Sequence, residues 1–244
     1  MKTIYFKDQR NLFAISFSRT SNEKIADKGS TVVQTYTFSL AQFDLILSGE
    51  KFTMQEFFKL DKSNCLDCPF SGNVRATDST KTVGCYTHKF MQYNGFISML
   101  KSAKNRFLSV ENIPYLSEDI AQTIVAQSVD KYVRFGTYGE PSLLPFNLVK
   151  SMAQVAKSYT GYTHQSTKIW AQKYADYFMA SVHGPEEVSQ NWRSFIAKDA
   201  KIDVPNAVIC PASKEAGYKS TCAKCGLCSG LLGKGKKDIV INVH

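Results

Sequence analysis

The sequence predicts an α/β protein built on a parallel sheet, either an open sheet or a partial barrel. Strand-like and helix-like segments alternate four or five times after Cys85, which is typical of parallel strands joined by crossover helices. The composition is that of a globular chain, because 43% of the 244 residues are hydrophobic and 21% are charged. A β-rich stretch precedes the alternating region, and a cysteine-rich segment follows it.

The first sixty residues contain both strand and helix signals. Extended segments rich in β-branched and aromatic residues cover 3–6, 12–17 and 31–38. Two short helices are expected next, because Ser39 with Gln42 and Thr53 with Glu56 match the capping-box pattern, and Gly49 is placed to end the first helix. Residues 61–84 are rich in Ser, Asp, Asn, Gly and Thr, so we expect a loop there.

From Cys85 onward the pattern is regular, and Ser117 and Pro145 mark the starts of two helices. The expected order is a helix at about 86–104, a helix after Ser117, a strand at 132–135, a helix from Pro145 to about 157, a strand at 159–163, a helix near 166–174, a strand at 177–182, a short helix near Pro185, and strands at 192–197 and 207–210.

The chain is basic, with a formal net charge of +9. Residues 201–244 hold seven Lys against three Asp or Glu, so much of the excess lies near the C-terminus. Such a balance favours encounters with nucleic acid, nucleotides or other anions, although a solvated tail explains it equally well. No stretch approaches the roughly 18 apolar residues of a membrane span, and the first ten residues contain no apolar leader, so we expect a cytoplasmic protein.

Seven cysteines fall into two groups, which indicates metal or redox chemistry in a cytosolic chain. The first group is Cys65, Cys68 and, after a gap of sixteen residues, Cys85. The second group has the spacing Cys-x11-Cys-x2-Cys-x2-Cys and comprises Cys210, Cys222, Cys225 and Cys228. A two-residue gap lets both thiolates of one turn face one metal, as in zinc and iron–sulfur sites.

Two metals suit the first group. Three thiolates would hold three irons of a [4Fe–4S] cluster and leave the fourth iron open, whereas His88 would complete a Cys₃His zinc site. The second group would hold either a closed auxiliary [4Fe–4S] cluster or a Cys₄ zinc, and both are structural by default because four thiolates saturate the site.

Polar and glycine residues follow several of the expected strands. The segments are Gly136-Thr-Tyr-Gly-Glu-Pro141, Gly161-Tyr-Thr-His-Gln165 and Ala180-Ser-Val-His-Gly-Pro185. In parallel α/β folds ligands gather beyond the carboxyl ends of strands, so these segments are candidates for function.

The segment 136–145 resembles the GGEP segment at the end of the second strand in the radical SAM superfamily, and 180–187 looks like a fourth-strand segment of many members. The combination of Cys85-Tyr86, Tyr-Thr-His and a late Cys-Pro with CxxCxxC resembles phage-encoded proteins of the "gene product 88" kind. The resemblance covers roughly residues 60–230. It implies a partial (β/α) barrel, TIM-like, at 61–209, with an N-terminal β extension at 1–60 and a C-terminal cysteine-rich metal segment with a basic tail at 210–244.

The resemblance also implies roles for individual residues. A [4Fe–4S] cluster on Cys65, Cys68 and Cys85 would bind S-adenosylmethionine, and His164 would be a proton donor or substrate ligand. The cofactor would contact Gly136, Tyr138, Gly139, Glu140 and Ser181, with Glu140 receiving its ammonium group. The family usually places its three cysteines within eight residues as CxxxCxxC, so the late Cys85 departs from the pattern, although a long loop closes at modest entropic cost.

Two functions follow from these observations. The first is a radical SAM-like enzyme that binds S-adenosylmethionine and acts on a nucleotide or nucleic acid. The alternative is a non-enzymatic, zinc-stabilised phage protein that binds nucleic acid through its basic surface. A third hypothesis is a barrel without catalytic activity that keeps a cluster for stability. The segment Gly230–Lys237 almost matches a P-loop, but Lys237 stands where Ser or Thr is required.

Overall fold

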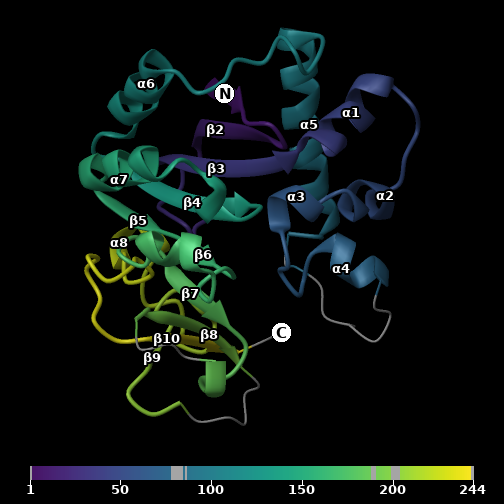
Figure 1. Cartoon of the computed structure of the whole chain (residues 1–244). Helices are drawn as coiled ribbons and strands as arrows, with labels where there is room; N and C mark the ends of the chain where they lie inside the picture. Colours follow the sequence, from purple (N-terminus) through teal and green to yellow (C-terminus); the bar gives the residue numbers. More distant parts are fainter. Residues whose placement is uncertain (1, 78–84, 86, 188–190, 199–203, 243–244) are drawn as a thin grey trace.

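The computed structural model describes residues 2–77, 85, 87–187, 191–198 and 204–242. Its first sheet has the strand order β1-β2-β3-β4-β5. The strands are β1 (Lys2–Lys7), β2 (Asn11–Arg19), β3 (Thr31–Ser39), β4 (Tyr132–Tyr138) and β5 (Ser158–Thr160). The first three pair antiparallel, whereas β3, β4 and β5 pair in parallel. The expected extension and the expected strand at 132–135 are thus joined in one sheet (Figure 1).

The second sheet is parallel throughout and has the order β6-β7-β8-β10-β9. Its strands are β6 (Tyr162–Thr163), β7 (Met179–Val182), β8 (Ser194–Lys198), β9 (Val208–Ile209) and β10 (Ile239–Asn242). Only Gly161 separates β5 from β6, so the chain passes from one sheet into the other at this residue. A Cβ on Gly161 would lie 2.5 Å from the Phe178 ring, which explains why glycine occupies this bend.

These sheets confirm the α/β class. In the first sheet the parallel strands β3, β4 and β5 follow one another in sequence order, and in the second sheet β6, β7 and β8 do the same. Within the described residues, no pairing joins β1 to β9, so barrel closure is not observed. The fold is therefore a mixed α/β arrangement of two parallel-rich sheets.

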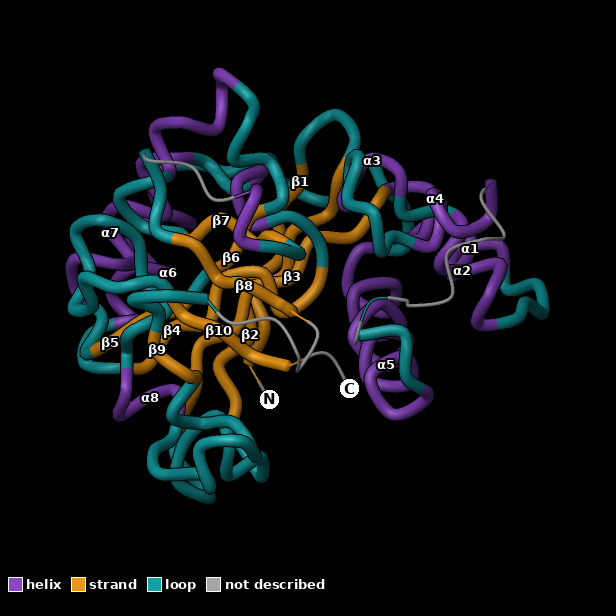
Figure 2. Tube along the Cα trace, turned by 90° about the horizontal axis from the view of Figure 1, so that it is seen from below, coloured by secondary structure: helices purple, strands orange, loops and turns teal. Residues whose placement is uncertain are grey.

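Helices cover both faces of the first sheet. In Figure 2 the strands lie between α6 and α7 on one side and α1, α2, α4 and α5 on the other. Val133 and Phe135 belong to the core beneath α6 and α7, and Phe38 and Tyr138 belong to the core beneath α1, α2 and α5. The helical segments are α1 (Leu40–Ser48), α2 (Met54–Lys59), α3 (Lys62–Cys65), α4 (Gly72–Thr77), α5 (Phe90–Phe107), α6 (Glu118–Ser128), η1 (Pro141–Leu143), α7 (Phe146–Val155), η2 (Ile169–Tyr174), η3 (Pro185–Glu187) and α8 (Cys222–Cys225).

Predictions that rest on a few adjacent residues are confirmed at the two helix starts and at Gly49. Both predicted capping boxes are present, at Ser39 and Thr53, and Gly49 ends α1 with a φ of 73°. The expectation of a plain loop at 61–84 was wrong for its described part, because α3 and α4 form there. Asp61 explains α4, since its carboxylate accepts hydrogen bonds from the N–H groups of Gly72 and Asn73 at 2.7 and 2.8 Å.

Other elements differ from the prediction in their bounds or type. The helix expected at 86–104 is α5, which begins at Phe90, while Tyr86 lies outside the described residues. The helix expected at 166–174 is the 3-10 segment η2. The strand β10 was not predicted, because four residues carry little periodic signal, yet it lies between β8 and β9 in the sheet.

Candidate metal and cofactor sites

The loop that carries Cys65 and Cys68 is held against the carboxyl ends of β3 and β4. The side-chain amide of Asn64 donates to the backbone oxygen of Thr37 at 2.9 Å. The backbone N–H of Glu140 donates to the backbone oxygen of Asn64 at 2.7 Å. The first cysteine pair therefore adjoins the strand-end segment that contains Glu140, although 75 residues separate Cys65 from Glu140 in the sequence.

All three cysteines of the first group are free, half-buried thiols. Burial raises the pKa of Cys65 well above its ordinary value, and the charges of Asp61, Cys68, Cys85 and Glu140 add to this effect. Burial likewise raises the pKa of Cys68 to about 12 and raises that of Cys85. These thiols stay protonated unless a cation compensates the thiolate charge, as a bound metal does.

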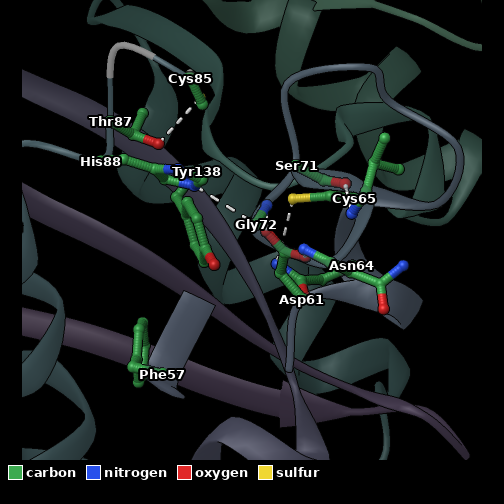
Figure 3. Close-up of polar contacts among 12 residues, drawn as sticks. Phe57, Asp61, Asn64, Cys65, Ser71, Gly72, Cys85, Thr87, His88 and Tyr138 are labelled. Carbon is green, nitrogen blue, oxygen red and sulfur yellow. Dashed lines mark hydrogen bonds and ion pairs between the residues drawn. The ribbon is translucent and has the colours of Figure 1, made fainter. Parts of the chain in front are cut away.

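The three sulfur atoms do not form a finished coordination shell. Figure 3 draws Cys65 beside Asn64 and Asp61, and Cys85 beside Thr87, whose hydroxyl lies 3.0 Å from the Cys85 sulfur. Across the described residues, no group of three or more Cys, His, Asp or Glu side chains is arranged to hold a metal ion. The three thiols are donors of the kind that bind zinc or iron, but their sulfur atoms are not arranged around a single metal position.

His88, the fourth ligand of the zinc alternative, faces Asp61. Its Nε2 atom lies 3.9 Å from Oδ2 of Asp61, and its ring stacks on Phe58 with centroids 3.9 Å apart. Burial raises the pKa of Asp61 to about 6, while backbone hydrogen bonds from Asn73 and Gly72 lower it. Sequence reasoning missed Asp61, because a single Asp in a polar segment carries no distinguishing signal.

Glu140 is a buried carboxylate at the meeting point of two strand ends. Its Oε1 accepts from the Ser142 hydroxyl at 2.7 Å and the Ser142 N–H at 3.0 Å, and its Oε2 accepts from the His164 N–H at 3.1 Å. Burial raises the pKa of Glu140, whereas hydrogen bonds from Ser142, Thr163 and His164 lower it. The side chain is thereby fixed beside the cysteine loop.

His164 and His183 follow β6 and β7, and the parallel pairing of these strands brings the two residues together. Their rings stack with centroids 5.6 Å apart, and Phe70 contacts both edge-on at 6.1 and 4.5 Å. Burial and the neighbouring His183 lower the pKa of His164 to about 4. The His164 Nε2 atom is buried and has no hydrogen-bond partner in the described part of the chain.

The remaining residues of the expected cofactor site have mostly packing roles. A Cβ on Gly139 would lie 2.5 Å from the Thr37 backbone oxygen, and one on Gly136 would lie 2.9 Å from Cδ of Pro141, so protein atoms fill the space beside both glycines. Tyr138 is 2% exposed, stacks on Phe96 and accepts from the Gln42 amide at 2.7 Å. The ring of Tyr138 is therefore enclosed by the core, and its contact with a cofactor stays a prediction.

Ser181 and Asp67 also lie at this edge of the sheets. Ser181 is half-buried on β7, opposite Phe195 of β8. Asp67 binds across to the segment after β6, since its carboxylate accepts from Gln165 at 2.7 Å and pairs with Lys168 at 2.7 Å. Together with Phe70, Asp67 ties the cysteine loop to the end of β6, a link that no local sequence pattern predicts.

The second cysteine group lies at the opposite ends of the strands. Cys222 and Cys225 bound α8, and the hydroxyl of Ser158, the first residue of β5, donates to the Ala223 oxygen at 2.6 Å. The backbone oxygen of Cys228 accepts from the Gly161 N–H at 3.1 Å. Burial is the largest cause that raises the pKa values of Cys210, Cys222 and Cys228, and neighbouring cysteines raise all three further.

The side chain of Arg193 binds backbone oxygens of the segment 227–237. Its guanidinium donates to the backbone oxygen of Leu227 at 2.8 Å and also to those of Ser229 and Lys237. Arg193 is buried directly before β8, so these bonds fix the segment that contains Cys228 against the second sheet. Sequence reasoning did not single it out, because a lone arginine near a strand has no specific pattern.

Comparisons with protein-family models, with curated proteins and with solved structures found no match for this chain. The described residues contain no helix that is both long and apolar enough to cross a membrane. Any assignment of function therefore depends on the geometry and chemistry of the two cysteine groups.

Proposed function

We propose that the chain is an iron–sulfur enzyme of the radical SAM type with a partial-barrel fold. The observation that carries the proposal is the contact between the cysteine loop and the strand-end carboxylate, made by the 2.7 Å hydrogen bond from the Glu140 N–H to the Asn64 oxygen. It brings a thiol donor set and a buried acid to one edge of a parallel sheet, where ligands of α/β folds bind.

The first cysteine group suits an open cluster. Cys65, Cys68 and Cys85 would hold three irons, and His88 is engaged with Asp61 and Phe58. When bound, the cluster and S-adenosylmethionine would supply a carbon radical that removes hydrogen from a substrate. The second group, with four cysteines, would hold a closed auxiliary cluster or zinc.

Protein groups at this edge would orient the reactants. Glu140 offers a carboxylate for a charge-assisted hydrogen bond to the cofactor ammonium. His164 is neutral above about pH 4, and its buried Nε2 is available for one hydrogen bond with substrate. The burial of both groups excludes water, which strengthens such contacts. The net charge of +9 favours a nucleotide or nucleic acid as substrate.

Metal analysis after anaerobic purification tests this proposal. About four irons and four sulfides per occupied cluster, with a broad absorption band near 400 nm, are expected from thiolate-ligated [4Fe–4S] centres. Reduced protein should then cleave S-adenosylmethionine. About two zincs per chain and a colourless solution would contradict the proposal, because two closed zinc sites give that result.

One observation favours the zinc-stabilised binding protein as a second candidate. The 3.9 Å approach of His88 to Asp61 resembles the way in which a carboxylate orients a metal-bound histidine through its other ring nitrogen. In that case His88→Ala should lower the zinc content, and nucleic acid binding should weaken steeply with salt. In a radical SAM-type enzyme, His88→Ala should keep its iron.

A further inference from the structure

A pocket of about 590 Å³ opens at the amino ends of β3, β4 and β5, the edge opposite to Glu140. This volume lies in the range of small-molecule sites, roughly 300–1,000 Å³. Its walls are the starts of the three strands, the segment before β3, and α8 with the chain that follows it. The lining residues are Ala26, Asp27, Ser30, Thr31, Asp130, Lys131, Tyr132, Lys157, Ser158, Thr221, Ala223, Lys224, Cys225, Gly226 and Lys234.

The lining carries four lysines against two aspartates. Lys224 is paired with Asp27 at 2.8 Å at the rim. For the other three lysines, Lys131, Lys157 and Lys234, no ion pair occurs among the residues that the structure describes. Asp130 also lines the pocket, so four lysines and two aspartates give the lining a net positive charge. An excess of one sign concentrates ligands of the opposite sign, so the pocket favours an anion.

These three lysines come from separate parts of the chain, and contacts between the segments that carry them place all three at one pocket. The Lys157 N–H donates to the Lys131 oxygen at 2.9 Å, which joins the segments that enter β5 and β4. A Cβ on Gly226 would lie 3.5 Å from Cβ of Ser158 and 4.0 Å from Cδ of Lys234, so the Lys234 side chain reaches the same wall. Lys234 lies in Gly230–Lys237, the segment that only partly matches a P-loop.

We propose that this pocket binds a phosphorylated small molecule of mononucleotide size, with its phosphates held by Lys131, Lys157 and Lys234. Ammonium groups bind phosphate oxygens through charge-assisted hydrogen bonds, and three lysines that line one pocket match the charge of a diphosphate. The contacts are side-chain ammoniums rather than the backbone cradle of a P-loop. Cys225 also lines the pocket, so the ligand lies beside the C-terminal cysteine group.

Isothermal titration calorimetry of the full chain with ADP, pyrophosphate and adenosine tests the site. ADP and pyrophosphate should each bind once per chain, more weakly as KCl is raised, and adenosine should bind at least about tenfold more weakly than ADP. The double variant Lys131→Ala/Lys157→Ala should lose at least about tenfold in ADP affinity, and Lys234→Ala should lose several-fold.

The matched control is Lys101→Ala/Lys150→Ala, which removes the same charge from exposed positions on α5 and α7. It should leave ADP affinity within about twofold of the unmodified chain. No binding of ADP or pyrophosphate at millimolar concentration, or an equal loss in both double variants, would overturn the proposal. Unchanged melting temperature and metal content establish that the variants fold, and Lys234→Ala alone carries the test if the pocket double variant does not fold.

This inference is independent of the chemistry proposed for the opposite edge. Phosphate binding is measured by heat, whereas the proposed enzyme is tested by iron content and cleavage of S-adenosylmethionine. Either result can fail while the other holds.

Discussion

The two cysteine groups lie at opposite ends of the same parallel strands, in unlike surroundings. Burial raises the pKa values of Cys65 and Cys68, and the neighbouring carboxyl groups of Asp61 and Glu140 raise them further. Cys210 and Cys228 belong instead to a core cluster with Met179 and Ile239. Polar groups fixed near three cysteines suit chemistry, whereas four cysteines, of which Cys210, Cys222 and Cys228 pack among apolar side chains, suit a structural site.

The largest expected effect is loss of activity on substitution of a cysteine at the carboxyl edge. Cys85→Ala should abolish cleavage of S-adenosylmethionine, by at least about a hundredfold, and remove the iron of one site, because three thiolates are needed to hold an open cluster. His88→Ala is the matched control and should keep both properties. Iron analysis and product chromatography measure the outcome, and full cleavage by Cys85→Ala would end the triad assignment.

The second effect is a loss of thermal stability on substitution of a cysteine in the C-terminal group. In the proposed C-terminal metal site, Cys222→Ala would remove one ligand and loosen the segment that contacts β5, so the protein should unfold at a clearly lower temperature. Loss of a structural metal ranks with the larger single-residue effects, and a few kcal/mol corresponds to a fall of about 5–10 °C for a chain of this size.

Differential scanning calorimetry gives both melting temperatures under anaerobic conditions. Cys85→Ala should melt within about 3 °C of the unmodified protein, since its loop contributes less to the core. A larger fall in Cys85→Ala than in Cys222→Ala would reverse the comparison between the edges.

A third effect concerns pH at the carboxyl edge. The folded protein holds the pKa of His164 at about 4, below its unfolded value of 6.5, so the neutral form is favoured on folding. This contribution to stability is present above pH 6.5 and is lost as the pH falls towards 4, by on the order of 3 kcal/mol in full.

Urea unfolding at pH 7 and pH 4.5 measures this effect. His164→Gln should show a smaller loss of stability between the two values than the unmodified protein, because glutamine does not titrate. An equal loss in both proteins would mean that His164 is not buried in its neutral form.

The smallest effect tests how closely the strand-end segment packs on the cysteine loop. Gly139→Ala should destabilise by about 1–3 kcal/mol, because Gly139 has a φ of 76° and an added Cβ meets the Thr37 oxygen. Gly95→Ala on α5 has open space around the new Cβ and should stabilise by about 0.5–1 kcal/mol. Urea unfolding compares the two, and a neutral Gly139→Ala would show that the segment can move away from β3.

Much of the local structure was predictable, because its causes lie within a few residues. The capping boxes at Ser39 and Thr53 and the alternation of strands and helices needed only adjacent sequence. The helix α4 was not predictable in this way, since Asp61 reaches it from eleven residues away. The strand β10 was missed because its register comes from β8 and β9 on either side.

The candidate site divides in the same way. Spacing alone grouped Cys65 with Cys68 and indicated metal chemistry, and Glu140 stood out by its place after a strand. The pairing of β6 with β7 brings His164 and His183 together, and the contacts of Phe70 with both rings close loops of about a hundred residues. The sequence by itself therefore determined most of the elements and the donor types. The tertiary structure decided which of them meet, and it also decided α4 and β10, because long-range strand pairing and burial leave no local trace.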